Sequence, residues 1–146
     1  MNVATAVLFL HVAAAATWRG AALWTPGDVR RTLALGQPHA RALAARARPA
    51  ILLDLWSGAA TLVTGALAVG LEGGRPRAGI VVGLVAVLVR LGLGFGMLRP
   101  AWRQVAHAIA ADDLAAARTS ALRVTLYGRV AHGLWVVALA GMVFRW

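Results

Sequence analysis

Two histidines, three arginines and one aspartate fall inside long apolar stretches of this sequence. They are His11, Arg19, Asp54, Arg90, Arg129 and His132. An ionisable side chain at membrane depth is costly, so it is expected to face a partner inside the protein and to mark a functional site. These six residues are therefore the first candidates for chemistry.

The two histidines suggest a metal-bearing cofactor. His11 and His132 each follow the start of an apolar stretch by a similar number of residues, and the two stretches are predicted to run antiparallel. At a rise of about 1.5 Å per residue, their depths in a ~30 Å hydrocarbon core would differ by only about 6 Å. Facing imidazoles can ligate the iron of a b-type haem from both sides. The spacing therefore predicts haem b with His11 and His132 as iron ligands, although each ring could instead hydrogen-bond within the bundle.

The charged residues are predicted to share one half of the membrane. Arg19, Arg90 and Arg129 against the single Asp54 leave an excess of about two positive charges, which predicts an Arg–Asp pair beside an anion or a water-filled cleft. With haem present, these arginines would lie near the propionates. Arg19 and Arg129 could instead extend to the lipid headgroups and anchor their helices.

The elements that must position these residues are membrane-spanning helices. Of the 146 residues, 60% are hydrophobic, whereas a soluble domain holds about 45–50% apolar residues. We predict an all-α, integral membrane four-helix bundle that forms a single domain over residues 1–146. The predicted spans are residues 3–24, 49–71, 78–98 and 124–144.

Charge predicts the orientation of the spans. The net charge is +10, and the basic residues are all arginine. Most of them lie in the connections 25–48 and 99–123, which should therefore be cytoplasmic, with both termini on the non-cytoplasmic side. Because these charges lie next to apolar spans, the lipid bilayer is the expected partner and nucleic acid is not. The first span lacks a basic segment before it and is expected to be a retained helix.

Cysteine is absent from the sequence, which excludes disulfides, thiolate metal sites and iron–sulfur clusters.

A few positions in the first two spans carry a family resemblance. They are Leu10-His11, Trp18 and Gly20 in the first span, Pro26 just after it, and Pro49-Ala50 and Gly58 in the second span. The pattern resembles the HemJ-type protoporphyrinogen oxidases and the related copper resistance protein D (CopD)-like proteins, which are small bacterial membrane proteins. The resemblance implies a haem-binding or porphyrin-binding protein of the bacterial inner membrane, in which His11 corresponds to the essential first-helix histidine.

The resemblance also implies electron transfer or oxidation of protoporphyrinogen IX. HemJ-type proteins place a lysine in the third helix, whereas this chain has no lysine. The resemblance thus implies the oxidase activity, but the lysine that accompanies this activity in HemJ-type proteins is missing from this chain.

Two other classes of function stay open. Small residues at helical spacing, such as Gly79 and Gly83, let membrane helices approach closely. They suit a cofactor-free accessory subunit of a larger respiratory or photosynthetic membrane complex, or a homo-oligomer. The charges around Asp54 suit a small transporter.

Overall fold

The computed structural model describes residues 2–23 and 25–143, which are helical almost throughout. The side chains of residues 22, 23, 25 and 26 lie outside this description, as do residues 24 and 144, the predicted ends of the first and last spans. The helices, in chain order, are α1 (Val3–Leu23), α2 (Thr25–Ala34), α3 (His39–Leu71), α4 (Ala78–Leu93), the π-helical turn η1 (Gly94–Leu98), α5 (Arg99–Ala110) and α6 (Leu114–Val143).

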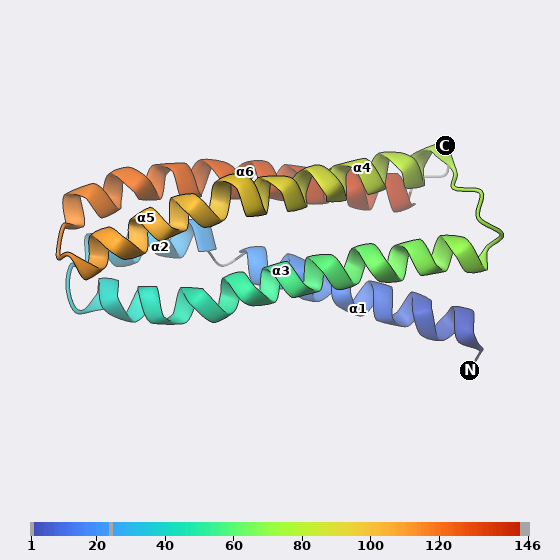
Figure 1. Ribbon diagram of the computed structural model, residues 1–146, viewed down its shortest axis with the longest axis horizontal. Coiled ribbons are helices and arrows are strands. Elements are labelled where there is room, and N and C mark those ends of the chain that lie inside the picture. The colour runs from blue at the N-terminus through green and yellow to red at the C-terminus, as the bar shows by residue number, and fades with distance from the viewer. Residues whose placement is uncertain (1, 24, 144–146) are drawn as a thin grey trace.

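Four helical segments are long and apolar enough to cross a membrane. They are Val3–Ala21, His39–Leu71, Ala78–Ala110 and Leu114–Val143. The prediction of an all-α, multi-pass membrane protein is therefore confirmed by helix length and composition. The start of α1 and the end of α6 lie at the same end of the bundle (Figure 1). Which end faces the cytoplasm stays a prediction.

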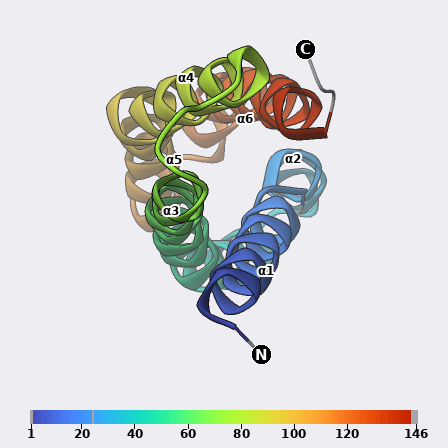
Figure 2. The same ribbon diagram turned by 90° about the vertical axis from the view of Figure 1, so that its right-hand side faces the viewer.

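The long helices are arranged as two antiparallel pairs. α1 packs along α3 and α4 packs along α6, with few contacts between the pairs, as the end-on view shows (Figure 2). α2 continues the direction of α1 but packs against α6 as well as α3. The residues that bridge the two pairs therefore decide how the bundle closes.

The second long helix begins earlier than its predicted span. α3 starts at His39 and carries Pro49 in its interior, where the span was predicted to begin. A proline inside a helix costs about 3 kcal/mol because it removes a hydrogen bond and crowds the preceding turn. The segment before it buries Ala40, Leu43 and Ala47, and this packing offsets that cost.

The third predicted span also continues as helix past its predicted end at residue 98. η1 joins α4 to α5, and Pro100 falls in the first turn of α5, where a missing N–H costs least. α4, η1 and α5 consequently form one nearly continuous rod (Figure 1), so the connection predicted to begin at residue 99 starts as a helix that continues the third span.

The segments predicted as connections form a packed arginine-rich end, made of α2, α5 and the first parts of α3 and α6. Its apolar core consists of Val29, Leu33, Ala40, Leu43, Ala47, Ala101, Trp102, Val105, Ala108, Ile109, Ala117, Ala121 and Val124. Ion pairs tie its surface together, including Arg46 with Asp28 at 2.7 Å. The arginine-rich end thus resembles a small soluble bundle continuous with the membrane helices.

The opposite half of the bundle turns large apolar side chains outward. Phe9 and Trp56 are 67% and 70% exposed, as expected for helices that face lipid. Inside this half, contact between α4 and α6 depends on glycine. A Cβ atom at Gly141 would overlap the carbonyl oxygen of Gly79 and lie 3.0 Å from the backbone nitrogen of Gly83.

Gly141→Ala tests this close approach. Because the clash is with backbone atoms that cannot rotate away, we expect a loss of about 1–3 kcal/mol in stability and a lower unfolding temperature in detergent. Gly133→Ala is the matched control, since it lies on the same helix with no atom within 4 Å of the added Cβ. Equal unfolding temperatures for the two variants would contradict the contact.

Candidate functional site

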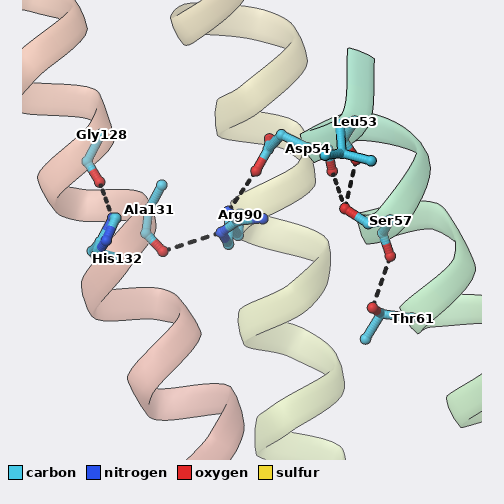
Figure 3. Close-up of polar contacts among 8 residues, drawn as sticks. All are labelled: Leu53, Asp54, Ser57, Thr61, Arg90, Gly128, Ala131 and His132. Atoms are coloured by element: carbon cyan, nitrogen blue, oxygen red, sulfur yellow. Dashed lines mark hydrogen bonds and ion pairs between the residues drawn. The ribbon is translucent and has the colours of Figure 1, made fainter. Parts of the chain in front are cut away.

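The centre of the bundle holds an ion pair between a buried arginine and an aspartate whose side chain is 25% exposed. The Arg90 guanidinium on α4 donates a hydrogen bond from its Nη2 to Oδ1 of Asp54 on α3, at 2.8 Å. Its Nε donates to the carbonyl oxygen of Ala131 on α6, at 3.2 Å. Figure 3 shows Arg90 between these two helices. The side chain is only 4% exposed. The predicted Arg–Asp pair is confirmed, and it links three helices.

An aromatic ring from the first helix completes the surroundings of this guanidinium. The Cζ of Arg90 lies 3.8 Å from the ring centroid of Trp18, a cation–π contact that strengthens when water is excluded. Trp18 is 1% exposed. A Cβ atom at Gly58 would lie 2.7 Å from the Trp18 ring, so glycine at this position makes room for the indole and hence for Arg90.

The Arg19 guanidinium has an aromatic contact but lacks a hydrogen-bond partner for one of its nitrogens. Its Cζ lies 5.0 Å from the ring centroid of Trp135 on α6. Its Nη1 is buried and has no hydrogen-bond partner among the described residues. A buried donor without an acceptor costs free energy. Nη1 of Arg19 is therefore a buried donor for which the described residues supply no acceptor.

His132 lines a small cavity beside the ion pair. Its Nδ1 lies 3.2 Å from the carbonyl oxygen of Gly128 in the same helix. The cavity also exposes Asp54, Arg90 and Trp102 and has a volume of about 50 Å³. That is room for a few water molecules, whereas pockets for organic ligands measure about 300–1,000 Å³. A porphyrin does not fit this cavity.

His11 is held by the helix that packs against it. Its Nδ1 lies 3.1 Å from both the carbonyl oxygen of Thr61 and the Oγ1 of Thr64 on α3. A carbonyl can only accept, so Nδ1 carries the proton. The Thr64 hydroxyl donates its own proton to Ala60 at 2.6 Å, which leaves its oxygen free to accept. Nε2 of His11 therefore keeps its lone pair for a ligand.

The ring of His11 rests on a glycine. A Cβ atom at Gly65 would lie 3.0 Å from the Cε1 of His11 and 3.9 Å from its Nε2. The imidazole is half-buried. The orientation of the ring is thus fixed by the hydrogen bonds of Nδ1 and by close packing against Gly65. Nε2 takes part in neither hydrogen bond.

The structure does not bring the two predicted iron ligands together. His11 contacts α3 at Thr61, Thr64 and Gly65, whereas His132 lies at the level of Asp54. From the helical rise, these levels are about 10–15 Å apart along α3. Two imidazoles on one iron must face each other across it, so the geometry offers a single histidine ligand. Haem binding itself stays a prediction.

Arg129 lies apart from the charged cluster. It is exposed and lines a hollow between α2 and α6 with Arg30 and Arg31. The sequence grouped it with Arg19 and Arg90 from depth alone, but position around the helix separates it from them. The role of Trp135 beside Arg19 was not predicted either; an aromatic residue near a membrane arginine is the signal that could have indicated it.

Comparison of the chain with protein-family models, with curated proteins and with solved structures gives no match. Among the described residues, no group of three or more His, Cys, Asp or Glu side chains is placed to hold a metal ion.

Asp54→Asn tests the buried pair. Removing one partner leaves the other charge uncompensated, and we expect a loss of about 3 kcal/mol in stability, measured by thermal unfolding in detergent. The control is Asp112→Asn, which removes a carboxylate paired with Arg41 at the same 2.8 Å but with both side chains at least 60% exposed. An exposed pair contributes about 1 kcal/mol at most. Similar losses in both variants would contradict the role of burial.

Proposed function

We propose that this protein binds haem b in the membrane through one axial ligand, the Nε2 of His11. The hydrogen bond from His11 to Thr61 carries the proposal. Histidines that ligate metals characteristically donate their other ring N–H to a carbonyl or carboxylate, which fixes the tautomer and the direction of the lone pair. The resemblance of the first two helices to HemJ-type and CopD-like proteins supports the same histidine. Bound haem would supply one-electron chemistry.

Arg19 is the second contact of the proposed site. It follows His11 by eight residues on α1, about 12 Å along the helix and less than a quarter turn around it. That offset is comparable with the reach from haem iron to a propionate. The unpartnered Nη1 of Arg19 would then donate to a propionate oxygen. Haem would be held by the Nε2 of His11 and the Nη1 of Arg19, neither of which lines the small cavity at Asp54.

The first test is an absorption spectrum of the detergent-purified protein, alone and titrated with hemin. We expect a Soret band from the wild type with a high-spin signature, because one histidine ligates the iron. His11→Ala should abolish the band, and added imidazole should restore it by replacing the missing ligand. His132→Ala is the matched control and should leave the band unchanged.

Imidazole rescue separates lost ligation from lost folding in this experiment. A wild type without a Soret band after hemin addition would overturn the proposal. A low-spin spectrum that needs both His11 and His132 would replace the single-ligand site with the paired one.

The second test concerns the propionate contact. A hydrogen bond between charged groups contributes about 1.5–3 kcal/mol, so Arg19→Gln should weaken hemin binding roughly tenfold or more. Titration followed at the Soret band measures this change. Arg129→Gln removes the same charge from an exposed position and should leave the affinity unchanged. Equal weakening in both variants would indicate general charge attraction rather than a contact at Arg19.

A further inference from the structure

A basic hollow lies between α2 and α6, away from the proposed haem site. Its lining includes the three guanidinium side chains of Arg30, Arg31 and Arg129, together with Gly27 and Thr125. Its volume is about 570 Å³, far larger than the cavity at Asp54. All three arginines are exposed. Two helices that are distant in sequence thus converge to place three positive charges around one open space.

These charges are not neutralised within the described part of the chain. The ion pairs found there join Arg41 to Asp112, Arg46 to Asp28 and Arg90 to Asp54. Asp28 lies on the same short helix as Arg30 and Arg31, but its carboxylate is taken by Arg46 of α3 at 2.7 Å and by the Thr32 hydroxyl at 3.2 Å. The hollow therefore retains its full positive charge for an external anion.

An apolar surface begins directly beside the hollow. Val130, next to Arg129 on α6, is 46% exposed, and Val136 and Val137 are 53% and 46% exposed two turns further on. At 3.6 residues per turn, Val136 lies on the same face as Arg129, about 10 Å along the helix. Gly133 separates them on this face with open space around it. A ligand with an anionic headgroup and an apolar tail would thus contact the basic hollow with its headgroup and the adjoining apolar surface with its tail.

We propose that the hollow binds the phosphate headgroup of an anionic phospholipid, with an acyl chain lying along Val130, Val136 and Val137. Arginine binds phosphate oxygens with paired N–H donors, and basic pockets between membrane helices are recognised sites for anionic lipid headgroups. The hollow adjoins α2, which directly follows the first membrane helix, and Arg129 lies near the predicted start of the fourth span. Both features place it at the level of the headgroups. The apolar surface of Val130, Val136 and Val137 favours a lipid over free phosphate, because only a lipid has an acyl chain to contact it.

The test measures the lipids that native mass spectrometry finds on the detergent-purified protein after exchange with phosphatidylglycerol or phosphatidylcholine. The wild type should retain phosphatidylglycerol in preference to phosphatidylcholine. Arg30→Gln with Arg129→Gln removes one charge from each helix and should lower this retention roughly tenfold or more. Arg75→Gln with Arg77→Gln removes two charges from the exposed connection between α3 and α4 and should leave retention unchanged.

Two outcomes would overturn the proposal. Equal loss from both double variants would show that net charge, not the hollow, attracts the lipid. Displacement of bound lipid by inorganic phosphate as readily as by added phosphatidylglycerol would show that the acyl chain contributes nothing and that the site takes phosphate alone. The unfolding temperatures of the two double variants are measured as well. They separate a loss of bound lipid from a loss of folding.

Discussion

One buried positive charge constrains the whole membrane half of this protein. The Arg90 guanidinium is almost fully removed from solvent and is satisfied by a carboxylate from α3, a backbone carbonyl from α6 and an indole face from α1. Sliding α3 by one turn against α4 would separate Arg90 from the Asp54 carboxylate and leave a charge unpaired in a medium of low dielectric, at a cost of several kcal/mol. The two helix pairs otherwise touch little. Arg90 therefore sets their register together with the buried apolar cluster of Trp18, Ala86, Val87 and Ala138.

The two halves of the bundle are stabilised by different interactions: burial of an apolar core in one, and close helix packing at glycines in the other. At the arginine-rich end, α2, α5 and the first parts of α3 and α6 bury an apolar core, as a soluble protein does. In the other half, lipid is as apolar as the side chains and gives them little reason to turn inward. There, large residues face outward and glycines such as Gly58 and Gly141 permit close contact. The Arg90 cluster lies where these two regimes meet.

This division explains what the sequence could predict. Composition and apolar length predicted four membrane-crossing helices, and opposite charges at similar depth predicted an Arg–Asp pair, which the structure assigns to Arg90 and Asp54. Helix continuity through Pro49 was not predictable, because it depends on packing against α2, α5 and α6 that no local pattern reports. The pairing of His11 with His132 was inferred from depth counted from span starts. The first start agrees with the beginning of α1, but the predicted start of the fourth span lies inside α6, and depth does not specify direction around a helix.

The arginines of this chain differ in how completely the protein satisfies them, and this difference separates structural residues from binding residues. Arg90 is held by a carboxylate, a backbone carbonyl and an indole ring, and the cavity beside it has room for only a few water molecules. Arg19 keeps one buried donor unpartnered, which costs free energy unless an anion accepts from it. Arg30, Arg31 and Arg129 stand open around a hollow. Because a membrane protein gains little by holding unpaired charge near lipid, the least satisfied arginines are where external anions should bind, and the fully satisfied one is where they should not.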